Sequence, residues 1–164
     1  MNQADAPLQQ HLRQALGRFT TGVTIVTCRD ASGAAIGLTA NSFSGVSLAP
    51  PLVLWSLRRS SPSLPVFAAA RHFAVNVLAE AQLDLSRRFA SAMDDKFGQG
   101  VWADGLNGAP LLAGCAANFE CESVSQQDTG DHVLFIGRVL ALSESALPPL
   151  VFQSGHYHML GEIM

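Results

Sequence analysis

The sequence predicts a mainly β protein, in which an antiparallel sheet closes into a barrel with a few short helices at its ends. Six or seven stretches are rich in β-branched and aromatic residues or alternate between apolar and polar residues, and turn signals bound them. These stretches alternate poorly with helical patterns, so a doubly wound parallel sheet does not fit. No internal repeat divides the 164 residues, which predicts a single domain over 1–164.

The first half of the chain predicts a helix, two strands and a second, short helix. Apolar residues at helical spacing predict the first helix over 7–18. The stretch 21–30 is dense in β-branched residues and ends at the turn signal DASG, which predicts the first strand. The near-continuous apolar run at 52–57 predicts a strand buried on both faces. A short helix is expected to begin between Pro62 and Pro65.

The second half predicts a helix, a long loop and several strands. Leucines and a phenylalanine at helical spacing predict a helix over 79–91. The stretch 93–112 is rich in Gly and Asp and predicts a long loop, and loops of that length are usually functional or interfacial. The remaining patterns predict strands at 72–78, 116–127, 132–142 and 149–160, of which the second and third pair across a DTG turn and the last turns tightly at Gly155.

Charge and cysteine content narrow the class of protein. The net charge of −3 and the absence of a long basic stripe argue against a nucleic-acid partner. Only 14% of the residues are charged, so we expect apolar surface to be covered by a second copy in a homodimer. Cys28, Cys115 and Cys121 are odd in number and form no CxxC motif, which predicts a reducing compartment. Without an apolar signal or membrane-spanning run, a cytoplasmic protein with no membrane contact is expected.

Two polar segments are candidates for ligand binding. In 37–47, GLTANSFSGVS, hydroxyl and amide groups lie among small residues, an arrangement that can line a flat heteroaromatic ligand. The alternative is a polar edge strand followed by a serine-rich turn. In 58–63, RRSSPS, serine hydroxyls, backbone N–H groups and two arginines resemble an anion cradle. The alternative is a solvated loop with N-capping serines.

Single residues add weaker signals. Lys96 beside Phe97 would neutralise a phosphate while the ring covers a flat ligand, or both are ordinary surface residues. His132, after a glycine and an aspartate, either hydrogen-bonds a ligand or is a polar residue at a strand start. His156 and His158 lack a third residue at metal-ligand spacing, so no metal site is expected. No nucleophile motif occurs, so an enzyme with this sequence would depend on a bound cofactor.

An ordered set of segments resembles the short-chain flavin reductases of the FMN-binding split-barrel class, the reductase components of two-component flavin-dependent monooxygenases. The segments are RFTTGVTIVTCRD, GLTANSFSGVSLAPPLVLWSL, SSPSLPVF, HFAVNVL, RRFAS, DKFGQGVW, GAPLL, GDHVLFIGRV and SGHYH. The resemblance implies a six-stranded Greek-key split β-barrel that works as a homodimer. It also implies hydride transfer from NADH or NADPH to FMN or FAD, with reduced flavin supplied to an oxygenase partner.

The resemblance further implies roles for individual residues. The implied flavin contacts are Thr39, Ala40, Asn41, Ser42 and Ser56 around the ring, Ser61 and Ser63 at the phosphate, and Lys96 and Phe97 closing over it. His132 and Tyr157 would be the catalytic residues on the nicotinamide side. Gln127 and Arg138 depart from residues common in the family, which leaves NADH against NADPH open. A non-catalytic flavin-binding protein and a split barrel that binds another cofactor such as haem are the alternatives.

Overall fold

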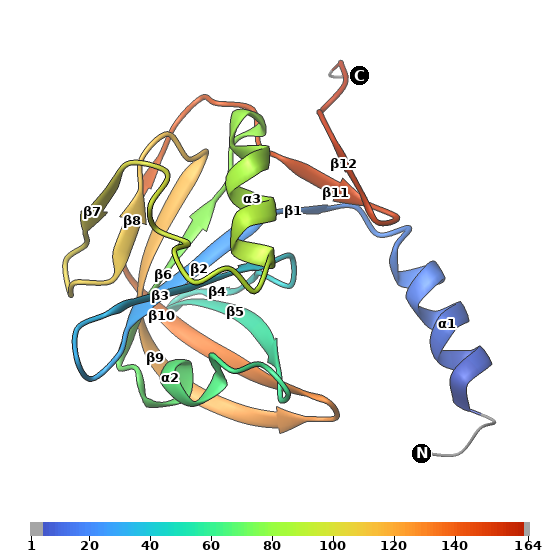
Figure 1. Cartoon of the computed structure of the whole chain (residues 1–164), viewed down its shortest axis with the longest axis horizontal. Helices are drawn as coiled ribbons and strands as arrows, with labels where there is room; N and C mark the ends of the chain where they lie inside the picture. Colours follow the sequence, from blue (N-terminus) through green and yellow to red (C-terminus); the bar gives the residue numbers. More distant parts are fainter. Residues whose placement is uncertain (1–4, 163–164) are drawn as a thin grey trace.

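A seven-stranded antiparallel sheet organises the protein in the computed structural model, which describes residues 5–162 (Figure 1). Its strand order is β3-β2-β6-β9-β10-β5-β4. The strands are β2 (Thr24–Arg29), β3 (Ala35–Ala40), β4 (Ser44–Leu48), β5 (Pro51–Arg58), β6 (His72–Val77), β9 (Ala117–Thr129) and β10 (His132–Glu144). The predicted mainly β class is confirmed, and the main sheet has one strand more than the six expected.

Two smaller sheets complete the β structure. β1 (Thr21–Gly22), β11 (Val151–Gln153) and β12 (His156–His158) form a three-stranded sheet, so the last predicted strand is a hairpin that turns at Gly155. β7 (Trp102–Asp104) and β8 (Pro110–Leu112) form a hairpin within the segment predicted to be a long loop. That prediction was incomplete because hydrogen bonds to residues distant in the sequence hold the hairpin. The buried Thr27 hydroxyl donates to the carbonyl of Pro110, and buried Asn76 accepts from the N–H of Leu112.

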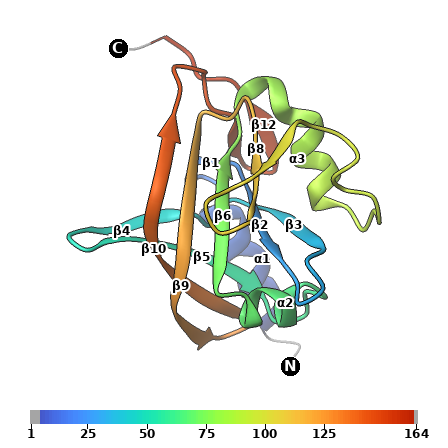
Figure 2. The ribbon, with the colours of Figure 1, turned by 90° about the vertical axis from the view of Figure 1, so that its left-hand side faces the viewer.

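Four helical segments flank the sheet. They are α1 (Asp5–Leu16), α2 (Leu64–Ala69), the 3-10 turn η1 (Glu80–Gln82) and α3 (Leu83–Ala90). Figure 2 shows α3 at one end of the barrel and α2 near the other, and Figure 1 shows α1 standing away from the sheet. The apolar face of α1 is therefore exposed at Leu8, Leu12 and Leu16. Among residues 5–162, no helix has both the length and the apolar character to cross a bilayer.

The main core lies behind β5. Val53, Trp55 and Leu57 are buried, whereas the alternate residues Leu52 and Leu54 are half-buried. The expectation that this strand is buried on both faces was wrong, because side chains of an antiparallel strand alternate and only one set faces the core. The Trp55 ring stacks on Phe135 of β10 with 4.6 Å between centroids, which ties β5 to its neighbour.

The pairing of β10 with both neighbours positions the start of that strand. β9 and β10 form the predicted hairpin, with Gly130 at a positive φ of 60° in its turn. This backbone conformation favours glycine, because it crowds the Cβ of other residues. β10 also pairs with β5 in a register that sets His132 opposite Arg58. The histidine of the GDH segment is thereby fixed beside the end of β5.

Candidate functional site

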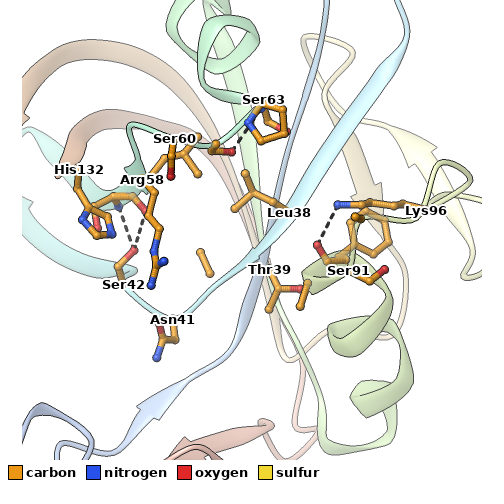
Figure 3. A pocket seen from close by; sticks show the side chains of 18 of the residues that line it. Leu38, Thr39, Asn41, Ser42, Arg58, Ser60, Ser63, Ser91, Lys96 and His132 are labelled. Carbon is orange, nitrogen blue, oxygen red and sulfur yellow. Dashed lines mark hydrogen bonds between the residues drawn. The ribbon is translucent and has the colours of Figure 1, made fainter. Parts of the chain in front are cut away.

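A cavity of about 740 Å³ opens where the end of β3, the end of β5 and the end of α3 meet (Figure 3). We call residues 38–42 and 56–58 with His132 the sheet wall, residues 60–63 the serine loop, and residues 89–93 with Lys96 the α3 wall. The predicted site residues that line the cavity are Thr39, Ala40, Asn41, Ser42, Ser56, Ser61, Ser63, Lys96 and His132. Phe97 and Tyr157 do not line it. Segments separated by more than 90 residues therefore share one cavity.

Hydroxyl groups of the sheet wall bind the protein itself. Ser42 Oγ accepts a hydrogen bond from the Ser56 N–H at 3.0 Å and donates to the Ser56 carbonyl at 3.2 Å. The Thr39 hydroxyl donates to the carbonyl of Ser86 in α3 at 2.6 Å. β3 is an end strand of the sheet, so its outer edge has backbone N–H and C=O groups without a strand partner. The hydroxyls of Thr39 and Ser42 are therefore already engaged within the protein.

The serine loop connects β5 to α2. The Ser61 N–H donates to the Arg58 carbonyl at 3.0 Å, and the Ser63 N–H donates to Ser61 Oγ at 3.3 Å. These bonds bend the loop, so that its serines line the cavity (Figure 3). The loop is thus ordered by its own polar groups, and Ser63, at the N-cap of α2, forms no side-chain capping hydrogen bond.

The α3 wall brings Lys96 to the cavity. The Lys96 ammonium donates to the Phe89 carbonyl at 3.1 Å, and Arg88 Nε donates to the Lys96 carbonyl at 2.9 Å. Burial lowers the pKa of Lys96 because the charged form loses water. Sequence analysis missed Ala90, Ser91, Ala92 and Met93 on this wall, since a short loop after a helix carries no ligand-binding pattern by itself.

Phe97 and Tyr157 lie behind the cavity. The ring centroid of Phe97 is 5.0 Å from that of Phe89 and 4.8 Å from that of Trp102. The Tyr157 hydroxyl lies 2.9 Å from Ser86 Oγ. The carbonyl of Ser86 accepts the hydrogen bond from the Thr39 hydroxyl. These two predicted site residues therefore support the lining from behind. The resemblance implied flavin or nicotinamide contacts for both residues, and in this structure both side chains contact α3.

The electrostatic character of the cavity is positive. Its lining contains Arg58 and Lys96 and no carboxylate. His132 Nδ1 lies 2.7 Å from a carboxylate oxygen of Asp131, which is not part of the lining. This hydrogen bond, with the charge of a protonated histidine, lowers the pKa of Asp131. Within residues 5–162, no group of three His, Cys, Asp or Glu side chains is arranged to hold a metal ion. The site is suited to a flat, anionic organic ligand.

Comparison with known proteins agrees with this fold. A family model described as a flavin reductase like domain matches residues 16–161, and the chain belongs to that family. It is 44% identical over 146 residues to the stachydrine N-demethylase reductase subunit of Rhizobium meliloti. The matched region covers 89% of this chain and 64% of that protein. It is 45% identical to the FMN reductase (NADH) SmoA of Agrobacterium fabrum, over 88% of this chain and 82% of that protein.

A solved structure extends the comparison. The NADH:FAD oxidoreductase of Streptomyces globisporus, in complex with NAD and FAD fragments, superposes with a TM-score of 0.90 at 36% identity. The match covers 96% of this chain and 95% of that one. By contrast, this chain spans 64%, 47% and 48% of the length of three of the curated relatives it matches.

Proposed function

We propose that this protein is an NAD(P)H:flavin oxidoreductase that transfers hydride from NADH or NADPH to FMN or FAD. The observation that supports it most is the cavity, where nine residues implied by the resemblance meet from five separate stretches of the chain. Two relatives described above, one matched by sequence and one by structure, are named FMN reductase (NADH) and NADH:FAD oxidoreductase. We infer that residues 1–164 form one domain of this kind.

The residues of the cavity fit a flavin. Its volume of about 740 Å³ lies within the range of small-molecule sites, roughly 300–1,000 Å³. The free backbone edge of β3 can pair with polar atoms of a heteroaromatic ring, and Lys96 with the serine loop can bind a phosphate. The absence of carboxylates from the lining fits an anionic ligand, since no lining residue would repel it.

Positioning is the contribution of this chain to the reaction. Bound flavin supplies the acceptor for the hydride that reduced nicotinamide donates. Residues 39–42 would hold one edge of the ring, while Ser61, Ser63 and Lys96 would hold the phosphate and so fix the ring's orientation. His132 would hydrogen-bond the nicotinamide side, with Asp131 holding the imidazole at 2.7 Å. Orientation of two rings face to face is a large part of such a rate acceleration.

The assembly is also part of the proposal. We infer that the protein is a homodimer, because α1 exposes Leu8, Leu12 and Leu16 on a helix that stands away from the sheet (Figure 1). Leu48 of the end strand β4 is 96% exposed, which adds an apolar, unpaired sheet edge. Light scattering should give the mass of two chains, and a monomer at micromolar concentration would contradict the dimer.

The product would serve a second enzyme. Relatives named as reductase components of flavin-dependent monooxygenases support an oxygenase partner that receives reduced flavin. The open cavity agrees with release, because a ligand that leaves must not be enclosed. We place the protein in the cytoplasm, where the three buried, free thiols at Cys28, Cys115 and Cys121 would stay reduced.

One assay tests the activity. NADH oxidation is measured as the loss of NADH absorbance, with and without added FMN or FAD, both under air and without oxygen. Flavin-dependent oxidation with reduced flavin accumulating without oxygen is the expected result. Tight flavin binding without turnover would instead indicate the non-catalytic alternative, and a Soret band in the purified protein would indicate haem.

A further inference from the structure

Two adjacent arginines at the end of β5 have opposite surroundings. The Arg59 guanidinium forms an ion pair with Asp128 at 3.2 Å, and the backbone N–H of Arg59 donates to the Asp131 carbonyl at 2.9 Å. Arg58 lines the cavity, and its side chain forms no hydrogen bond or ion pair with any residue in the described range 5–162. Arg59 is therefore held by a surface ion pair, whereas Arg58 faces the cavity with no hydrogen-bond or ion-pair partner among residues 5–162. The positive charge of Arg58 also helps to lower the pKa of Asp131, which lies outside the lining.

Arg58 belongs to the His132 side of the cavity. The β5–β10 register sets the two residues opposite each other. In Figure 3 the guanidinium of Arg58 points toward Asn41 and away from Ser60 and Ser63. Lys96 lies across the cavity on the α3 wall. The two cations are thus separated, and they can bind two different anionic groups.

The chemistry of the guanidinium indicates what kind of anion it binds. Arginine presents several N–H donors in a fixed plane that matches two phosphate oxygens at once, whereas a lysine ammonium acts as a point charge. The Arg58 guanidinium is exposed, has no hydrogen-bond or ion-pair partner in the described part of the chain and faces a lining without carboxylates, so it is available for such a group. A pyrophosphate, with oxygens on two linked phosphates, suits this fork.

We propose that Arg58 is a specificity residue that binds a dinucleotide pyrophosphate at the His132 side of the cavity. This inference rests on the proposed function, in which the nicotinamide ring lies beside His132. The pyrophosphate of NAD(P)H is joined to that ring through one ribose, so it falls on the same side. FAD also carries a pyrophosphate, so the experiment below distinguishes binding of NAD(P)H from binding of FAD.

The test compares Arg58→Gln with the matched control Arg59→Gln. With FMN saturating, the Arg58 variant should raise KM for NADH about tenfold and leave kcat within about twofold, since a charged hydrogen bond to a substrate group away from the reacting atoms is lost. With 1-benzyl-1,4-dihydronicotinamide, which has the reacting ring and no phosphate, variant and wild type should have equal rates. The Arg59 variant should match wild type with both donors.

Flavin titrations distinguish the source. An increase in KM for NADH with unchanged Kd for FMN and FAD assigns Arg58 to the hydride donor. A higher Kd for FAD, with unchanged Kd for FMN and unchanged KM for NADH, assigns Arg58 to the flavin pyrophosphate. No change, or an equal loss for FMN and FAD, would overturn the proposal. If wild type shows no flavin-dependent NADH oxidation, the proposed function fails, and that result is distinct from an active protein whose Arg58 variant behaves normally.

Discussion

The sheet wall and the α3 wall face each other across one cavity, but different forces hold them. Most of the sheet wall belongs to paired strands, whereas Asn41 and Ser42 follow the end of β3, and the buried rings of Trp55 and Phe135 stack behind the wall. The α3 wall continues past the end of the helix, where residues 91–93 are exposed. Individual hydrogen bonds from Arg88 and Lys96 hold that segment.

This difference suggests a division of labour between the walls. A wall that belongs to a cooperative sheet keeps its geometry, which suits recognition of a ring edge. A wall held by a few exposed bonds opens at lower free energy, which suits a ligand that must leave. Under the proposed function, the sheet wall would set orientation, and the α3 wall would set affinity through Lys96.

The largest effect is expected from removing the ring behind the sheet wall. Trp55→Ala should lower the free energy of unfolding by about 3–5 kcal/mol, because a fully buried indole is lost and leaves a cavity. Urea unfolding measures the change. Leu106→Ala, at a side chain that is 70% exposed, is the control and should change stability by about 0.5 kcal/mol or less. A loss of under about 1 kcal/mol for the Trp55 variant would contradict the account of the sheet wall.

A smaller effect is expected on the α3 wall. Lys96→Ala should weaken FMN binding about tenfold and riboflavin binding little, because only FMN carries the phosphate that the ammonium would bind. Fluorescence titration of both flavins gives the two Kd values. Arg87→Ala, on α3 but outside the cavity lining, should leave both unchanged. An identical loss for FMN and riboflavin would remove Lys96 from the phosphate site.

The pH dependence sharpens the same point. Because burial lowers the pKa of Lys96, the ammonium loses its proton at a lower pH than an ordinary lysine, whose pKa is about 10.4. The preference for FMN over riboflavin should therefore be present near neutral pH and fall as pH rises through this lowered pKa. Titrations between pH 7 and the onset of alkaline unfolding measure it. Lys96→Arg should keep the preference over that whole range, and a decline in this variant would assign the effect to another group.

The smallest effect concerns the histidine of the sheet wall. His132→Ala should slow hydride transfer about fivefold and change flavin affinity less, because a hydrogen bond that orients the nicotinamide is lost. Stopped-flow reduction gives the rate, and flavin titration gives the Kd. His156→Ala, at the exposed start of β12 and outside the cavity, is the control. Equal losses of rate and affinity would place His132 on the flavin instead.

Much of the fold followed from local patterns. The hairpin of β9 and β10 was predicted because two alternating runs flank a DTG turn, and α3 because its apolar residues have helical spacing. The β7–β8 hairpin was missed because Asn76 and Thr27 hold it, and these residues are distant in sequence. Polar and glycine-rich composition alone does not distinguish a free loop from one bound by buried side chains.

The candidate site shows the same limit. The serines of 60–63 and the residues of 39–42 stood out because small polar residues in a row rarely form a core. Phe97, from its place beside Lys96, and Tyr157, from the resemblance, were expected at the site, and neither lines the cavity. Sequence spacing cannot tell whether an aromatic ring faces a ligand or fills the space behind one, since both positions favour the same residue type.

The sequence by itself determined the mainly β class, most of the strands and the segments that carry polar chemistry, because side-chain alternation and turn residues act over a few positions. Only the tertiary structure decided which of those segments meet, and which of two adjacent arginines faces the cavity. That choice depends on the register of β5 against β10 and on where Asp128 lies, and such pairings over about 70 residues leave no local trace in the chain.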